Sequence, residues 1–210
     1  MYAEIFTHYP ALGKAAELRS ALEERARAET AAGSAHLVGR LVYADEPAFM
    51  TMIRHKSLAA VEVHQNRRTG DPAFQSFLRK SAEASARAPS MALYEYLVPA
   101  TASAASARFA LWRTFQPAPG KAGELRAAVE KRAHTPSPGA LGKIVYARVL
   151  GPGQPPFVLN TLFASLADLE TYLKAQPTDP AVQAFVAQVA GLSVSGGHAE
   201  LYRVLLPFPS

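Results

Sequence analysis

Histidine is the residue type in this chain that is best suited to proton transfer or metal binding near neutral pH. The chain has six histidines and no cysteine, which excludes disulfides, thiolate metal sites and cysteine nucleophiles. Three histidines of the first half align with aromatic residues of the second: His8 with Phe115, His55 with Phe163 and His64 with Tyr172. An imidazole exchanges protons near pH 7, whereas a phenyl ring does not. Any active pocket is therefore expected in the first half.

A metal site shared by His8 and His55 is excluded by the expected strand register. If the strands that carry them are adjacent and antiparallel, His8 pairs with Phe49 and Tyr2 pairs with His55. The two histidines then lie at opposite strand ends, roughly 20 Å apart at the rise of a strand. Ligands of one metal ion lie only about 2 Å from it. No HxH or HExxH spacing is present, so we predict no metal and no cofactor.

His8, Tyr43 and His64 are the candidate residues for a ligand-binding pocket. The same register sets Tyr43 beside Phe49, so that His8, Phe49 and Tyr43 cross one face of three strands. His64 borders the apolar stripe of the following helix. Imidazole and phenol groups facing a cavity between sheet and helices could hydrogen-bond a planar organic ligand. The alternative is that these are core residues with satisfied polar tips, and no catalytic residue is assigned.

An internal repeat positions these residues. The stretch "SLAAVEVHQNRRTGDPAFQSFL" begins at Ser57, and "SLADLETYLKAQPTDPAVQAFV" begins 108 residues later at Ser165. The similarity between the two halves covers almost the whole chain, and the differences in length are confined to loops. We therefore predict two copies of one domain, residues 1–99 and 108–210, joined by a small-residue linker at 100–107.

Each copy is predicted to contain a strand, a helix, two strands, a helical region and a last strand. Runs of aromatic and branched residues such as "YAEIFTH" predict strands, and leucines at helical spacing from residue 12 predict the first helix. The expected capping residues of the later helices are Ser57, Ser165, Asp71 and Asp179, the last two followed by proline. This βαββαβ order is ferredoxin-like and predicts an α+β fold.

Composition and charge restrict the partners of the protein. The net charge is +5, but the basic residues are scattered and form no stripe with interleaved aromatic residues, so nucleic acid is not expected. No apolar run reaches the roughly 18 residues that a membrane span needs, and no basic leader opens the chain. We expect no membrane partner and a cytoplasmic location.

Short motifs in the second copy carry a resemblance to a known family. Pro119-Gly120-Lys121, "F-x-SLADLE" and "DPAVQAF" resemble the NIPSNAP family. That family sits in the dimeric α+β barrel group, with the antibiotic-biosynthesis-monooxygenase-like proteins. The resemblance implies that the tandem ferredoxin-like units form an intramolecular dimeric α+β barrel. The chain would then be a monomeric pseudo-dimer, or would form a homodimer of it.

The resemblance also implies a function. A NIPSNAP-like protein would bind a small organic molecule, with cofactor-independent oxygenase or isomerase action on an aromatic or polyketide-like compound. The alternative is a non-catalytic interaction or structural module with filled cavities, and a cavity of several hundred cubic ångströms separates the two. Haem binding or degradation is less favoured. The first strands offer Thr7 and Thr114 where that branch uses asparagine, and only His64 could ligate haem. Whether the chain is an enzyme stays open.

Overall fold

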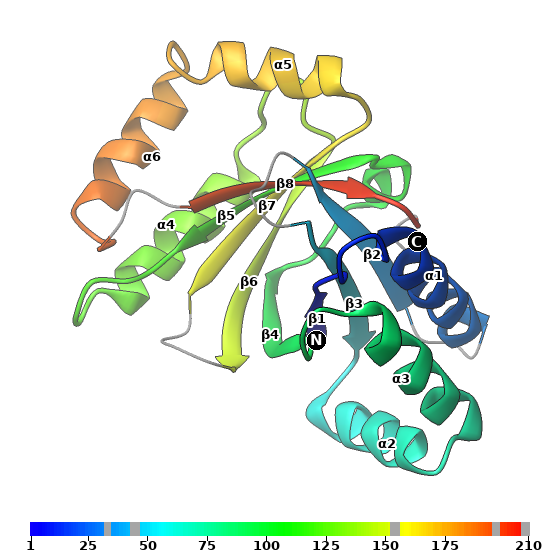
Figure 1. The fold of residues 1–210 in the computed structure, drawn as a ribbon. Helices are drawn as coiled ribbons and strands as arrows, with labels where there is room; N and C mark the ends of the chain where they lie inside the picture. Colours follow the sequence, from blue (N-terminus) through cyan, green and yellow to red (C-terminus); the bar gives the residue numbers. More distant parts are fainter. Residues whose placement is uncertain (32–34, 43–46, 152–155, 195–197, 207–210) are drawn as a thin grey trace.

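The protein is a β-barrel flanked by helices (Figure 1). The structure is a computed structural model and describes residues 1–31, 35–42, 47–151, 156–194 and 198–206. The first half contains β1 (Tyr2–His8), α1 (Ala15–Ala31), β2 (Ala35–Val42), β3 (Phe49–His55), α2 (Leu58–Thr69), α3 (Pro72–Ala84) and β4 (Ser90–Val98). The second half contains β5 (Phe109–Phe115), α4 (Ala122–His134), β6 (Gly142–Leu150), β7 (Phe157–Phe163), α5 (Leu166–Ala175), α6 (Pro180–Ala190) and β8 (His198–Val204).

The strands form one closed barrel in the order β1-β3-β2-β8-β5-β7-β6-β4. Within the first half the order is β4-β1-β3-β2, and the second half has the corresponding order β8-β5-β7-β6. Both are the ferredoxin-like arrangement that the element order predicts. The halves meet through antiparallel pairs of β2 with β8 and of β4 with β6. The predicted α+β barrel is thus confirmed, and one chain closes it without a second subunit.

The predicted register of β1 and β3 is also confirmed. Tyr2 pairs with His55 and His8 pairs with Phe49, so His8 and His55 lie at opposite ends of the strand pair. The predicted neighbour of Phe49 on β2 is wrong. Phe49 pairs with Arg40 rather than Tyr43, because β2 already ends at Val42 and the connection to β3 is longer than a tight hairpin.

Side chains fill the interior of the barrel. Alternate residues of each strand point inward, as Ala3 and Ile5 do on β1. Around the middle of the barrel Trp112 stacks on Tyr146, with ring centroids 5.5 Å apart. The linker contributes as well, because it folds into a 3-10 helix (Ala102–Ser106) whose Ala104 packs against this core. Among the residues that the structure describes, the outer face of the barrel is therefore the place for a ligand site.

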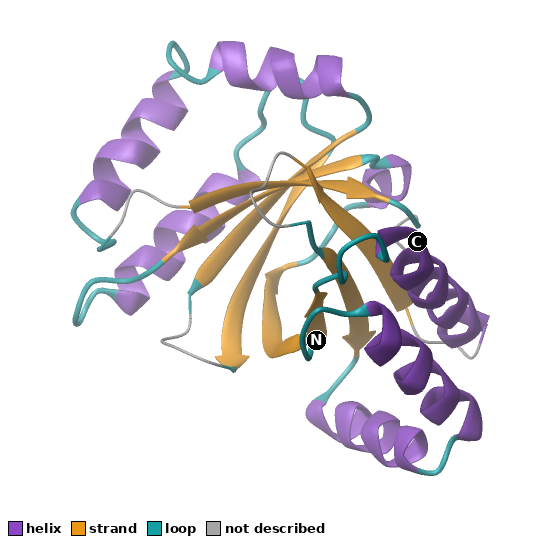
Figure 2. Cartoon of the chain, viewed as in Figure 1, coloured by secondary structure: helices purple, strands orange, loops and turns teal. Residues whose placement is uncertain are grey.

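The helices cover the outer face of the barrel in two groups, with α2 and α3 on one side and α5 and α6 on the other (Figures 1 and 2). Their starts follow the predicted caps. Ser57 Oγ accepts a hydrogen bond from the amide of Ala60, and Asp71 accepts one from Ala73 with proline at the next position. Ser165 and Asp179 act in the same way in the second half. No helix among the described residues is long and apolar enough to cross a membrane.

Candidate functional site

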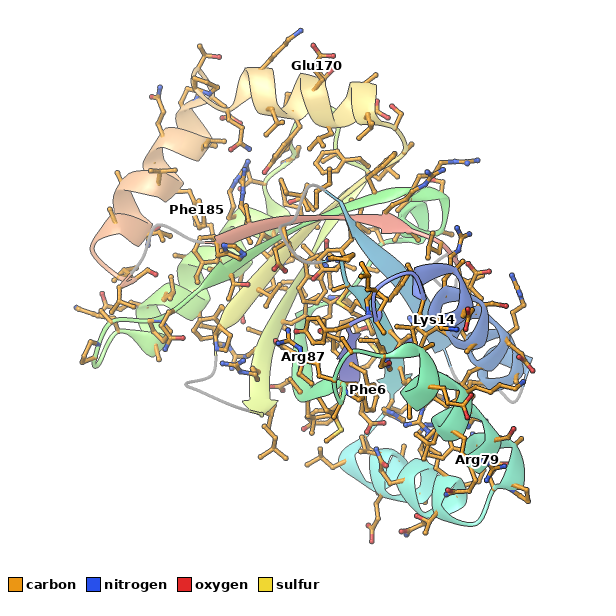
Figure 3. All side chains as sticks on the ribbon, viewed as in Figure 1. Phe6, Lys14, Arg79, Arg87, Glu170 and Phe185 are labelled. Atoms are coloured by element: carbon orange, nitrogen blue, oxygen red, sulfur yellow. The ribbon has the colours of Figure 1, made fainter. Side chains whose placement is uncertain are left out.

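A cavity of about 530 Å³ lies between the outer face of the first-half sheet and its helices. Because side chains alternate along a strand, Phe6 and His8 of β1 and Thr51 of β3 share this face. The remaining lining comes from α1, the end of α2, α3 and the loop after it: Leu22, Arg25, Arg68, Phe74, Phe77, Leu78, Ser81, Ala82, Ser85, Arg87, Ala88 and Pro89. Figure 3 labels two of them, Phe6 and Arg87. The size suits a drug-sized organic molecule.

His8 is the titratable imidazole of this cavity. It is the last residue of β1 and is 6% exposed, and its Nε2 lies 3.2 Å from the hydroxyl of Thr51. This hydrogen bond fixes the orientation of the ring. Burial, together with the nearby Arg68, lowers the pKa of His8 to about 4. The imidazole is therefore neutral at pH 7 and can accept a proton.

Arginine side chains give the cavity a positive character. Arg25 and Arg68 both stack on Phe74, at 4.9 and 4.7 Å from the ring centroid. Arg87 stacks on the ring of Tyr9 at 3.7 Å. No aspartate or glutamate belongs to the lining within the part of the chain that the structure describes. The combination of aromatic faces and guanidinium groups favours a planar ligand that carries negative charge.

The buried carboxylate of Glu29 forms ion pairs with Arg25 and Arg68 of the cavity wall. Its carboxylate is 1% exposed and forms ion pairs with Arg25, with Arg67 at 2.9 Å and with Arg68 at 3.6 Å. A buried carboxylate of this kind requires such partners, because an unpaired charge is costly away from water. Glu29 thus fixes two guanidinium groups at the cavity wall.

The predicted site residues do not all meet in this cavity. His8 lines it, whereas Tyr43 lies outside the described residues. His64 is buried on α2 beside His55, with ring centroids 5.0 Å apart, and does not belong to the cavity lining. Burial, then Arg68, lowers the pKa of His64 to about 4, although Glu29 and Glu4 act in the opposite direction.

Several residues that the sequence motifs do not predict complete the cavity and the buried group around His55 and His64. Glu4, next to His55, and the arginines at positions 25 and 68 are the main ones. A signal for Glu4 was present, since it alternates with Phe6 and His8 on β1, and the third residue of β5 is Leu111. A glutamate on the helix-facing side of a strand indicates a possible site, because a buried carboxylate requires a charged or hydrogen-bonding partner.

The corresponding place in the second half is packed with apolar side chains. By position in their elements, His8, Thr51 and Ser81 correspond to Phe115, Leu159 and Val189. These three belong to one buried apolar cluster, in which Phe115 also contacts Phe185 of α6. Another hollow, of about 590 Å³, lies between the loop at 117–121, the start of α4, and β6 and β7, but no histidine lines it.

The lowered pKa of His8 predicts a loss of stability in acid. Below pH 6.5 the unfolded chain takes up a proton on His8 that the folded protein does not take up until about pH 4. Because one pH unit corresponds to about 1.4 kcal/mol, His8 should remove about 3 kcal/mol of stability between pH 7 and pH 4. Urea unfolding of His8→Phe should show a smaller loss over this range than the wild type, by about that amount. Equal losses in both proteins would contradict the burial of a neutral His8.

Comparison with known proteins shows which fold the chain shares with solved structures. No protein-family model and no curated protein matches the chain. Among solved structures, a "putative monooxygenase" from Fusobacterium nucleatum subsp. nucleatum ATCC 25586 is similar, with a TM-score of 0.77, 11% identity and coverage of 100% of this chain and 94% of that chain. An anthrone oxidase-like protein gives 0.68 at 14% identity, covering 97% and 91%. A protein from Lactobacillus acidophilus NCFM, described in the same words as the first, gives 0.68 at 12%, covering 97% and 93%. At these identities the likeness concerns the dimeric α+β barrel fold.

Proposed function

We propose that this chain binds a planar, acidic aromatic molecule in the first-half cavity and that His8 removes a proton from it in a cofactor-independent oxygenation. The observation that carries the proposal is the cavity itself, about 530 Å³ with one imidazole, three arginines and three hydroxyl groups on a mainly apolar wall. A purely structural module would be expected to fill this space. The second half does so at the corresponding place, with Phe115, Leu159 and Val189.

The cavity residues suit the chemistry of an aromatic ketone with an acidic methylene group. His8 takes a proton from the carbon, and the resulting enolate is stabilised by the positive charge of Arg68. Dioxygen is the oxidant: it accepts electrons from the enolate carbon and forms a C–O bond there, and the proton on His8 passes to the outer oxygen to give a hydroperoxide. His8 then removes the second proton from that carbon, the O–O bond breaks to leave a carbonyl group, and the proton on His8 joins the departing hydroxide as water. In total a methylene compound and O₂ give a ketone and water.

The comparisons agree with this substrate class, but the proposal rests on the cavity and not on them. One structural neighbour is described as anthrone oxidase-like, and an anthrone is a planar ketone with such a methylene group. The resemblance of Pro119-Gly120-Lys121 and the "DPAVQAF" motif to the NIPSNAP family points to the same group of barrels. We propose that the chain is NIPSNAP-like, with a division at residues 1–99 and 108–210.

Blocking the mouth of the cavity should abolish ligand binding. Ala82 is exposed on α3 and lines the cavity, so Ala82→Trp places a large ring in the opening without disturbing the core. The probe is dihydroxyanthraquinone, a coloured planar phenol that is not a substrate of the oxygenation. Spectroscopic titration should show binding by the wild type and at least tenfold weaker binding by Ala82→Trp.

Ala190→Trp is the matched control, because Ala190 occupies the same position of α6 and is also exposed. It should bind the probe as the wild type does. Equal binding by all three proteins would place the ligand elsewhere, and no binding by the wild type would contradict the proposal for this ligand class. Native mass spectrometry of freshly purified protein would then identify any organic molecule that stays bound.

A further inference from the structure

Glu4, His55 and His64 form a buried group that the proposed oxygenation does not use. They come from β1, β3 and α2, and are 3%, 6% and 5% exposed. One ligand atom of each lies within 4.8 Å of those of the other two. Glu4 Oε2 lies 2.7 Å from His55 Nε2, and the His55 and His64 rings are tilted by 57° to each other.

His64 has a ring nitrogen without a partner. Its Nδ1 faces Arg67 Nη2 at 3.4 Å and Glu29 Oε2 at 3.8 Å. Its Nε2 is buried and has no hydrogen-bond partner among the residues that the structure describes. A buried polar atom left unsatisfied is unfavourable, so an arrangement that retains one calls for an explanation.

We propose that Glu4, His55 and His64 bind a divalent first-row transition-metal ion. Two imidazoles and one carboxylate are a common ligand set for such ions, and they leave coordination positions open. Metal–ligand distances of about 2 Å require ligand atoms roughly 3–3.5 Å apart. Glu4 Oε2 and His55 Nε2 need to separate slightly from 2.7 Å, and no two of the three ligand atoms are more than 4.8 Å apart. The ion replaces the hydrogen bond between His55 Nε2 and Glu4 Oε2.

Neighbouring groups suit this role. Gln65 Nε2 donates a hydrogen bond to Glu4 Oε1, which leaves Oε2 on the side of His55. Glu29, beyond His64 Nδ1, is placed to hold that ring as carboxylates do behind metal-bound histidines. Its negative charge also offsets the charges of Arg67 and Arg68 near the site.

Packing alone does not account for these side chains. The corresponding residues of the second half are Leu111, Phe163 and Tyr172, and they form a buried apolar cluster. Phe163 and Tyr172 pack edge to face with centroids 5.2 Å apart. The fold therefore accepts apolar residues at all three positions. Packing does not require the polar side chains of Glu4, His55 and His64, so we infer another role for them.

Cobalt titration tests the site directly. After treatment with a chelator, the full chain should bind one equivalent of Co²⁺, with visible absorption bands that Zn²⁺ abolishes by competition. Glu4→Leu, His55→Phe and His64→Tyr copy the second half and should each weaken binding at least 100-fold. His8→Phe and His198→Phe should bind as the wild type does, since His8 lies in the cavity and His198 is exposed.

Circular dichroism identifies any variant that fails to fold. If the variants do not fold, the site is tested by metal binding to the wild-type protein. A crystal grown with Zn²⁺ should show an anomalous scattering peak between Glu4, His55 and His64. No stoichiometric binding, unchanged affinity in the folded variants, or a peak only at other residues would overturn the proposal. Failure here is separate from failure of the proposed function, because Ala82→Trp blocks the cavity and leaves these ligands in place.

Discussion

Replacing His8 with phenylalanine is expected to lower the oxygen-dependent turnover of dihydroxyanthrone by roughly 100- to 10,000-fold, the range that general bases contribute. The variant copies Phe115, which fills the same place in the second half, so the substitution suits the fold. It removes the proton acceptor and keeps the shape of the cavity wall. Oxygen consumption and the absorbance of the quinone product measure the rate, and titration with dihydroxyanthraquinone should show binding within tenfold of the wild type.

The pH dependence of the same reaction provides a second readout. Because the pKa of His8 is lowered to about 4, kcat/KM of the wild type should be constant from pH 6 to 8 and fall only as the pH approaches 4. An unaltered His8 would give a fall near pH 6.5. Turnover by His8→Phe at the wild-type rate would exclude His8 as the base. Turnover of the wild type without oxygen would point to an isomerase and contradict the oxygenation.

Local patterns explain which parts of the fold could be predicted. The aromatic and branched residues of β1 and the helix cap at Asp71 are local patterns of a few neighbouring residues, and the structure has the strand and the cap as expected. The register of β1 with β3 followed because the ferredoxin-like order makes them neighbours. The pairing of Phe49 failed because a connection between strands can add residues without any change in the strands themselves.

The arrangement of the site depends on contacts that no local pattern encodes. His8 and His64 were both singled out, but their separation into a cavity and a buried cluster depends on how α2 lies over the sheet. His64 points toward Glu4 and His55, and Arg68, one turn later, reaches the cavity instead. Side chains one helical turn apart share a face, so spacing alone places both near the sheet and does not choose between the two sites.

Neutralising Glu29 should produce the largest loss of stability among the single changes considered for this chain. Glu29→Gln preserves the shape of the side chain and removes the charge that pairs with Arg25, Arg67 and Arg68. Arg25 and Arg68 are themselves mostly buried, so their charges would remain without this carboxylate. Breaking a buried ion pair by removing one partner typically lowers the free energy of unfolding by about 3–5 kcal/mol. Urea unfolding at pH 7 measures the change.

Glu170→Gln is the matched control for this effect. Glu170, labelled on α5 in Figure 3, pairs with Lys174, and both side chains are exposed. Such pairs contribute about 1 kcal/mol or less. Glu29→Gln should therefore be the more destabilised variant by several kcal/mol. Because Arg25 and Arg68 line the cavity, bound dihydroxyanthraquinone, an acidic phenol, should recover more stability in Glu29→Gln than in the wild type. A loss no larger than that of Glu170→Gln would mean that the arginines keep their positions without Glu29, and that the positive wall of the cavity does not depend on it.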